Sequence, residues 1–112
     1  MTQCLFCKMV AGEIKADVII EDDAVLAFRD INPQAPVHLL IIPKVHIATL
    51  NDLNDTLLAG RLLQTAIKLA KQEGLAEDGY RTVFNCNRNG GQEVYHLHLH
   101  VLGGRQMIWP PG

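Results

Sequence analysis

The stretch that decides the fold and the chemistry of this chain is His96-Leu-His-Leu-His-Val-Leu102. Side chains of a β-strand alternate between the two faces of a sheet. A strand here therefore places its three histidines on one face, and Leu97, Leu99 and Val101 on the other. Alternate residues lie about 6.5–7 Å apart along a strand, so the imidazoles can cooperate. The sequence predicts a strand that is anchored in the core by one face and displays three imidazoles on the other.

These histidines have three competing interpretations. A lone histidine in a strand is usually structural, but three of the chain's five histidines lie within five residues. Imidazole titrates near pH 6.5, or about neutrality, which suits nucleophilic and acid–base catalysis. Imidazoles at alternate positions of a strand are also good zinc ligands. The pattern therefore favours a chemical role over a structural one, and the flanking sequence has to decide between catalysis and metal binding.

The segment just before the histidines contains Gly90-Gly91 within the range 85–95. Glycine permits backbone conformations that turn N–H groups toward an anion, as phosphate-binding loops do, and Asn85 can add a neutral donor. An ordinary glycine turn between two strands is the alternative interpretation of the pair. Because it lies directly before three histidines, the segment favours a phosphate ester or amide as the substrate.

The rest of the chain predicts an α+β fold in one domain, residues 1–112. A short helix is expected from Cys4 to Ala11, ending at Gly12, and a long one from about Asp55 to Glu73, ending before Gly74. The apolar stripe of the long helix is predicted to contain Leu58, Leu62, Ile67, Leu69 and Ala70. Short strands are expected at 18–20, 24–28, 38–42, 80–84 and 96–102. Short strands with so few helices predict an antiparallel sheet covered by helix.

Composition excludes several classes of function. The 112 residues are 48% hydrophobic and 20% charged, with a formal net charge of −2, which is typical of a globular chain. No cluster of Lys or Arg supports binding to a nucleic acid or a membrane surface. Charged residues interrupt the first twenty positions, so no signal peptide is expected. The three cysteines do not resemble a secreted disulfide framework, and a cytoplasmic location is predicted.

The whole chain resembles the histidine triad superfamily, and within it the Hint branch of histidine triad nucleotide-binding proteins, in a bacterial-type form. The histidine run matches the triad signature, in which histidines alternate with hydrophobic residues. Three further stretches and the C-terminus carry the same resemblance: Phe28-Arg-Asp-Ile-Asn-Pro-Gln-Ala-Pro36, Gly90-Gly-Gln-Glu-Val-Tyr95, Leu102-Gly-Gly-Arg-Gln-Met107 and Trp109-Pro-Pro-Gly112.

The resemblance implies a HIT-like fold: a five-stranded antiparallel sheet with one short and one long helix, in a homodimer with a continuous sheet. It implies hydrolysis of the P–N bond of a purine nucleoside 5′-phosphoramidate of the AMP type, with no catalytic cofactor. His98 would attack phosphorus and form a nucleotidylated intermediate that water then cleaves. His100 would bind the phosphate oxygens and assist proton transfer. His38 and His96 would complete the catalytic cluster by holding ring tautomers and orientations.

The same resemblance implies a nucleotide-binding set. Asp30 would accept hydrogen bonds from the ribose, and Phe6, Phe28 and Ile31 would surround the base. Asn85, Gly91 and Val94 would lie near the phosphate, and Trp109 would reach the leaving group from the neighbouring subunit. Plainer alternatives stay open, with Phe28 and Ile31 as core residues, Asp30 as a turn residue and Trp109 as a surface aromatic. Glu93 stands where some members carry a serine, and a carboxylate near a phosphate puts the leaving-group preference in question.

Cys4 and Cys7, taken with His46 and His96, resemble the zinc site of some triad proteins and of the related uridylyltransferases. Two thiolates and two imidazoles form a closed tetrahedral set, which is structural and not catalytic. The alternative is that the cysteines are simply packed in the N-terminal helix.

Two other functions compete with phosphoramidate hydrolysis. One is hydrolysis of dinucleoside polyphosphates, as in the Fhit-like branch, although the Trp-Pro-Pro-Gly ending argues against it. The other is a nucleotide-binding or scaffold protein whose hydrolysis is incidental.

Overall fold

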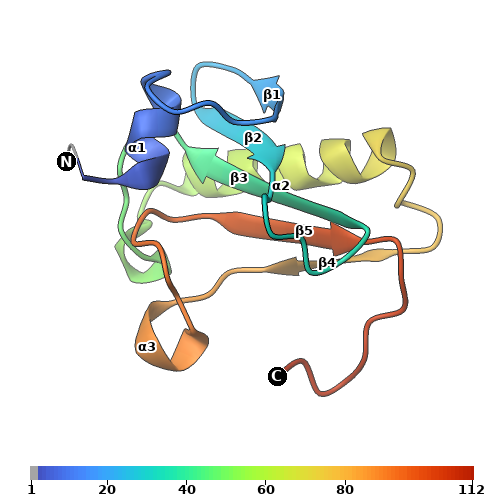
Figure 1. The fold of residues 1–112 in the computed structure, drawn as a ribbon. Helices are drawn as coiled ribbons and strands as arrows, with labels where there is room; N and C mark the ends of the chain where they lie inside the picture. The colour runs from blue at the N-terminus through green and yellow to red at the C-terminus, as the bar shows by residue number, and fades with distance from the viewer. Residues whose placement is uncertain (1–2) are drawn as a thin grey trace.

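The computed structural model describes residues 3–112 and contains five strands and three α-helices. The elements in chain order are α1 (Leu5–Val10), β1 (Val18–Glu21), β2 (Val25–Arg29), β3 (Val37–Pro43), a 3-10 turn at Leu50–Asp52, α2 (Thr56–Gln72), β4 (Tyr80–Val83), α3 (Asn87–Gly90) and β5 (Leu99–Gly103). The strands form one sheet in the order β1-β2-β3-β5-β4, and every neighbouring pair is antiparallel (Figure 1). The predicted α+β fold with a five-stranded antiparallel sheet is confirmed.

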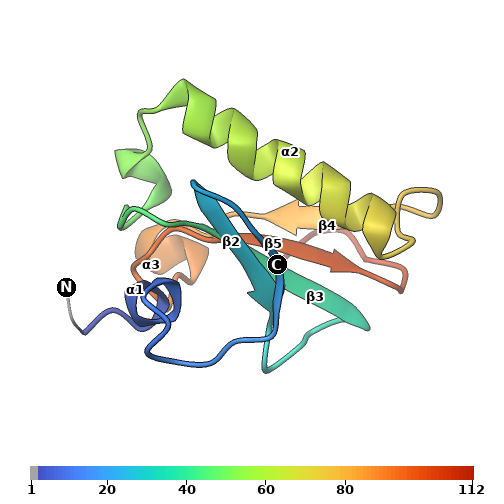
Figure 2. The same ribbon diagram turned by 90° about the horizontal axis from the view of Figure 1, so that it is seen from above.

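The two faces of the sheet carry different cores. Figure 2 shows α2 lying along one face and α1 on the other side. The α2-side core joins the inward residues of the sheet to those of α2, and its buried members are Val25, Ala27, Leu39, Ile41, Leu62, Ala66, Leu69, Ala70, Leu75, Leu97, Leu99 and Val101. The α1-side core is smaller and comprises Phe6, Leu26, Phe28, Leu40 and Ile42. All three apolar residues of the histidine run lie in the α2-side core, as their alternation predicted.

The histidine run is less regular than predicted. Strand β5 begins at Leu99, so His96 lies in a bend before it and His98 precedes it without strand pairing. Leu97, Leu99 and Val101 are nevertheless at most 1% exposed, as predicted, but His96 is fully buried too, whereas His98 and His100 are half-buried. His100 lies within β5, opposite Leu40 of β3 and Val83 of β4. The inward-facing apolar residues were therefore predicted correctly, whereas the start of the strand and the display of His96 beside the other two histidines were not.

The long helix has the predicted extent but one wrong inward residue. Asp55 caps it by accepting hydrogen bonds from the N–H groups of Leu57 and Leu58, and Gly74 follows it with φ +74°. Ile67 was predicted on the buried stripe, yet it is 39% exposed. Five residues after Leu62, it is turned about 140° around the helix from that side chain. Thr65 and Ala66 are buried in α2 instead.

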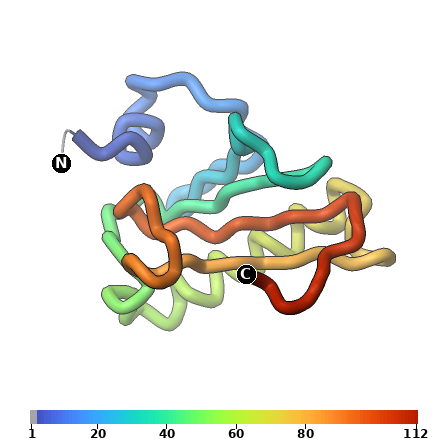
Figure 3. Tube along the Cα trace, turned by 60° about the horizontal axis from the view of Figure 1, so that its bottom comes forward, coloured from blue at the N-terminus to red at the C-terminus, as the bar shows by residue number. Residues whose placement is uncertain are grey.

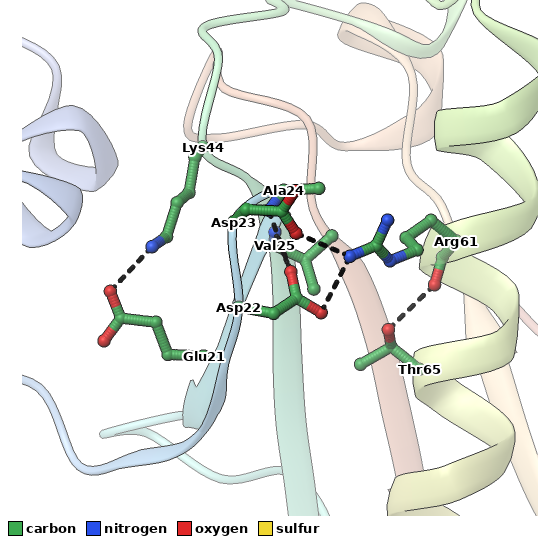
Figure 4. Close-up of polar contacts among 8 residues, drawn as sticks. All are labelled: Glu21, Asp22, Asp23, Ala24, Val25, Lys44, Arg61 and Thr65. Atoms are coloured by element: carbon green, nitrogen blue, oxygen red, sulfur yellow. Dashed lines mark hydrogen bonds and ion pairs between the residues drawn. The ribbon is translucent and has the colours of Figure 1, made fainter.

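The turn between β1 and β2 is tied to α2 by charge. The Asp22 carboxylate accepts hydrogen bonds from the N–H groups of Ala24 and Val25, which shapes the turn. The Arg61 guanidinium reaches across from α2 to Asp22 at 3.3 Å and Asp23 at 2.7 Å (Figure 4). The backbone N–H groups, and then Arg61, hold the pKa of Asp22 below its usual value. These contacts fix one end of the β1-β2 hairpin against the helix.

The C-terminal segment returns along the edge of the sheet. Figure 3 shows it running beside β4 after leaving β5. The Arg81 guanidinium of β4 donates a hydrogen bond to the carbonyl of Ile108 and lies 6.0 Å from the centre of the Trp109 ring. None of the helices within residues 3–112 has the length and apolar character that crossing a membrane requires.

Candidate active site

The imidazoles of His38, His98 and His100 gather on the face of the sheet that α1 partly covers. His38 is in β3 and His100 in β5, and their ring centres are 5.1 Å apart. The ring of His98 lies 5.0 Å from that of His100 and 5.3 Å from that of Phe6, which meets it edge-on. Strand pairing thus brings together residues that are sixty positions apart in the chain. These are three of the four histidines that the sequence proposed as catalytic.

The hydrogen bonds of His38 fix its tautomer. The backbone N–H of Gln34 donates to Nδ1 of His38 at 3.0 Å, so that nitrogen carries a lone pair and no proton. In the neutral ring the proton is then on Nε2, which lies 2.9 Å from Nδ1 of His100 and 3.4 Å from a carboxylate oxygen of Asp30. His38 therefore donates to His100, and its backbone contact prevents it from accepting a second proton where it stands.

The same chain of bonds determines the tautomer of His100. Its Nδ1 accepts from His38, so its own proton is on Nε2. Within residues 3–112, that Nε2 is the only buried side-chain nitrogen or oxygen atom that lacks a hydrogen-bond partner. A buried donor without a partner costs free energy. Because residues 3–112 contain no other unpartnered buried side-chain nitrogen or oxygen, we infer that the N–H of His100 is placed to meet a ligand.

His98 is held in the complementary tautomer. Its Nδ1 lies 2.8 Å from the backbone carbonyl of His96, which can only accept, so Nδ1 carries the proton. The lone pair is left on Nε2. The site consequently presents a nucleophilic nitrogen on His98 and an N–H donor on the neighbouring His100.

Burial disfavours the charged forms of His38 and His100. It lowers the pKa of His100 to about 4, with further contributions from the nearby His98 and His38 rings. Burial also lowers the pKa of His38, although the Asp30 carboxylate opposes this effect. Neutral rings donate and accept at defined nitrogens, which the relay from Gln34 to His100 requires. At neutral pH, His100 acts as an uncharged hydrogen-bond donor.

The residues predicted to bind the nucleoside line one side of this cluster. Phe6 of α1 and Phe28 of β2 are both buried, and their rings meet edge to face at 5.5 Å. Asp30 follows β2 and also accepts from the N–H of Asn32 through its other oxygen at 2.8 Å, which leaves it half-buried beside His38. Ile31 is 97% exposed, so it is not a core residue in this chain.

The residues predicted near the phosphate lie on the segment between β4 and β5. Asn85 and Val94 are half-buried, and Val94 packs on the α1-side core. Gly91 ends α3 with φ +76°, a conformation that glycine adopts readily. The expected glycine turn is thus a single helical turn. Glu93 is exposed to solvent, and Trp109 is 79% exposed beside Arg81 of β4.

His96 turns away from the other histidines and joins a second cluster. Its Nδ1 lies 3.4 Å from Sγ of Cys4 and 3.5 Å from Sγ of Cys7, and Nδ1 of His46 lies 3.3 Å from Sγ of Cys7. The four ligand atoms all lie within 4.8 Å of one another. Tetrahedral zinc with usual Zn–S and Zn–N bonds would hold sulfur and nitrogen about 3.5 Å apart. The spacing therefore fits the metal without rearrangement.

The tautomer of His96 also suits metal binding. Its Nε2 lies 2.8 Å from the backbone carbonyl of Pro43, so Nε2 carries the proton and the Nδ1 lone pair faces the two sulfurs. A carbonyl on the far nitrogen is the usual support of a metal-binding imidazole. The structure thus places His96 with the cysteines, while its backbone carbonyl supports His98.

A second group of potential metal-ligand atoms, on Asp30, His38 and His100, does not offer a metal site as it stands. Its atoms also lie within 4.8 Å of one another. However, Nε2 of His38 carries a proton because the backbone N–H of Gln34 occupies its Nδ1. This cluster is a hydrogen-bonded relay.

Three residues of the site escaped the sequence analysis. Gln34 and Pro43 act through backbone groups, which the identity of a side chain does not reveal. Gln92 is a buried polar residue within the segment that leads to the histidines, and no periodic pattern distinguishes it. Pro33 and Pro36, on either side of Gln34, indicated a loop, which was the one available signal.

Comparisons with known proteins agree with this geometry. A family model described as the HIT domain matches residues 11–107. The purine nucleoside phosphoramidase of Escherichia coli (strain K12) is 52% identical over 107 residues, which cover 94% of this chain and 90% of that protein. The 14 kDa zinc-binding protein of Zea mays is 55% identical over 113 residues, covering 96% of this chain and 87% of that protein. The crystal structure of a HIT family hydrolase from Legionella pneumophila Philadelphia 1 superposes with a TM-score of 0.96 at 66% identity, covering 98% of this chain and all of that one.

Proposed function

The chain belongs to the HIT domain family, and we propose that it is a hydrolase that cleaves the P–N bond of purine nucleoside 5′-phosphoramidates. The observation that carries the proposal is the pair of opposite tautomers in the histidine cluster. His98 presents a lone pair on Nε2, and His100 presents an unpartnered N–H beside it. A phosphoryl group placed between them meets a nucleophile and a hydrogen-bond donor together.

In the first step, Nε2 of His98 attacks phosphorus. A bond forms between Nε2 and phosphorus while the bond from phosphorus to the substrate nitrogen breaks, and the leaving amine takes a proton from water. In the second step, a water molecule attacks phosphorus and gives a proton to the hydroxide left by the first step, the bond to His98 breaks, and the nucleoside monophosphate leaves. Nδ1 of His98 keeps its hydrogen bond to the carbonyl of His96 throughout, which stabilises the positive charge that the ring acquires when it is nucleotidylated.

His100 binds a phosphoryl oxygen, and His38 holds His100 in place. Nε2 of His100 donates to an oxygen whose negative charge grows as the new bond forms. His38, fixed by the backbone of Gln34, holds the other nitrogen of His100 and so keeps the donor aimed without paying for reorganisation. His100 is a catalytic residue in this account, while His38 is a positioning residue.

The remaining predicted contacts orient the nucleoside. The Asp30 carboxylate can accept hydrogen bonds from the ribose hydroxyls, and Phe6 and Phe28 offer aromatic surface for the base. Asn85, Gly91 and Val94 lie on the segment that adjoins the phosphate. Trp109 and Glu93 remain candidates for contact with the leaving group.

The Cys4, Cys7, His46 and His96 cluster is proposed to hold a structural zinc ion. With four protein ligands the ion would have no open position for substrate, so its contribution would be to the fold. It would join α1 to the segments that carry His46 and His96. That connection matters because α1 also supplies Phe6, whose ring packs against His98.

A homodimer and a cytoplasmic location complete the proposal. Strand β4 is an edge of the sheet, so pairing of this edge with a second copy would continue the sheet. On α2, Leu63 and Ile67 are 49% and 39% exposed, an apolar contribution to such an interface. A dimer would also bring Trp109 near another subunit. The location rests on cysteine usage.

The decisive test is turnover of an adenosine 5′-phosphoramidate that carries a fluorescent amine, by the protein and by His98→Asn. Asparagine can still accept or donate hydrogen bonds but cannot form the nucleotidylated intermediate. We expect turnover in the unaltered protein, none above background in His98→Asn, and retained binding of adenosine monophosphate in both. Absence of turnover in the unaltered protein, with adenosine monophosphate bound, would instead support a nucleotide-binding protein.

A further inference from the structure

Gln92 is the buried anchor of the segment that adjoins the phosphate. Its side chain is buried, with 8% of the residue exposed, whereas Gly91 and Glu93 on either side of it are exposed. A buried amide is expected to have its polar atoms paired, and here every part of it is. Among the described residues, Gln92 makes no hydrogen bond to a histidine of the site, and its only link to the proposed binding residues is through the carbonyl of Val94, so its burial calls for an explanation.

The amide joins three stretches of chain. Oε1 of Gln92 accepts from the backbone N–H of Asn87 at 2.9 Å. Nε2 donates to the carbonyls of Ala48 at 2.8 Å and Val94 at 3.1 Å. The orientation of the amide is unambiguous, since an N–H group faces its oxygen and two carbonyl groups face its nitrogen. One side chain therefore closes the turn of α3 and ties it to the segment that follows β3.

The backbone of the segment does not supply this connection by itself. Its own hydrogen bonds, from Gly91 N–H to the Arg88 carbonyl and from Gln92 N–H to the Asn87 carbonyl, remain inside the turn. The turn also contains Asn87 at φ +59°, a conformation that costs a non-glycine residue free energy. Such a turn needs an outside contact to hold its place, and Gln92 provides a buried one.

The support that Gln92 reaches is also bonded to the histidine run. The backbone N–H of Leu97 donates to the carbonyl of Ile47 at 2.6 Å, one residue before Ala48. The stretch Ile47-Ala48 thus holds two parts of the chain. Ile47 binds Leu97, next to His98, and Ala48 binds the α3 turn through Gln92. The distance between His98 and the turn is set by this shared support.

We propose that Gln92 is a positioning residue that fixes the Asn85–Val94 segment against His98. It thereby supports the contacts of this segment with the phosphoryl group, and it does not affect the contacts with the nucleoside. The proposal rests on the proposed function, in which this segment adjoins the phosphate. Loss of the amide contacts would leave the nucleoside contacts of Asp30, Phe6 and Phe28 in place, because these come from β2 and α1.

The test compares two substitutions of the same residue. Gln92→Glu has nearly the same shape but sets a carboxylate oxygen against the carbonyls of Ala48 and Val94. Gln92→Met has a similar length and makes none of the hydrogen bonds. The matched control is Gln72→Glu, the same chemical change at an exposed residue at the end of α2. Calorimetry measures the affinity of each protein for adenosine monophosphate and for adenosine, which lacks the phosphate.

We expect both Gln92 variants to bind adenosine monophosphate about ten- to a hundredfold more weakly, the loss expected for two or three hydrogen bonds. Their affinity for adenosine stays within about twofold of the unaltered protein, as do both affinities of Gln72→Glu. The Gln92 variants therefore lose the preference for adenosine monophosphate over adenosine, and Gln72→Glu keeps it. A residue that merely supports the fold would lower both affinities together.

Several results would overturn the proposal: equal losses for the two ligands, no loss for either, or failure of both Gln92 variants to fold, which would make the residue a support of the whole domain. An unaltered protein that binds adenosine monophosphate no better than adenosine would overturn it too, because no phosphate contact would exist to support. Turnover of the adenosine 5′-phosphoramidate is measured separately. Selective phosphate binding without turnover would refute the hydrolase and leave the role of Gln92 standing.

Discussion

The neutral state of His100 can be tested through the pH dependence of stability. Burial, with His98 and His38 nearby, lowers the pKa of His100 to about 4, from 6.5 in an exposed ring. Between these values the unfolded chain binds a proton that the folded chain refuses, so stability falls as the pH is lowered through this range. For this pair of values, the linkage relation gives a loss of about 2 kcal/mol between pH 7 and pH 5.

The assay is urea denaturation of the unaltered protein and of His100→Asn at one fixed chain concentration, from pH 7.5 to pH 4.5. Asparagine does not titrate, so the variant lacks this particular loss, whatever its starting stability. The other groups titrate in both proteins and cancel in the difference. We expect the difference in the free energy of unfolding to move by about 2 kcal/mol in favour of His100→Asn between pH 7 and pH 5. Two curves that stay parallel within about 0.5 kcal/mol would refute the assignment of a buried neutral imidazole.

Two further predictions concern the core and the metal. Leu69→Ala, in the α2-side core at 0% exposed, should lower the free energy of unfolding by about 2–5 kcal/mol, while Leu57→Ala, 85% exposed on the same helix, should change it by less than about 0.5 kcal/mol. Similar urea midpoints for the two variants would contradict the assignment of the inward face. Elemental analysis of protein purified without chelators should find about one zinc ion per chain, and far less in Cys7→Ser. Cys86→Ser, outside the cluster, should retain the metal; equal zinc in both variants, or none in the unaltered protein, would leave Cys4 and Cys7 as packing residues.

The sequence predicts well what depends on side-chain periodicity. Alternation in the histidine run correctly assigns Leu97, Leu99 and Val101 to the core, because successive side chains of extended chain must face opposite ways. It overstates the strand, since His96 lies in a bend and His98 precedes the paired residues. Alternation indicates which apolar side chains face the core, whereas pairing depends on where a neighbouring strand ends.

Helical periodicity was less decisive. Ile67 was assigned to the buried stripe of α2 on its apolar character, but its angle around the helix faces solvent, and Thr65 takes a buried place. The α3 turn was missed because four residues are too few to show a period, and its glycines equally suit an open turn. A segment must be long enough to repeat a pattern before the pattern can predict its secondary structure.

Within the site, residue types and their groupings were predictable, but the hydrogen bonds that define tautomers were not. The backbone N–H of Gln34 and the carbonyls of Pro43 and His96 decide which nitrogen of each ring carries a proton. Every residue has such backbone groups, so no sequence pattern identifies the ones that matter. The position of His96 illustrates this: its ring joins the cysteines, and its carbonyl supports His98.

The most direct test of the central claim is to locate the covalent intermediate. The protein is mixed with an adenosine 5′-phosphoramidate, quenched within milliseconds under conditions that preserve phosphorus–nitrogen bonds, and digested for mass spectrometry of the peptides. We predict an adenylyl group on His98 that forms and decays at the rate of turnover and is absent from His98→Asn. Turnover without any adduct on His98, or an adduct on His100 instead, would contradict the assignment of His98 as the nucleophile.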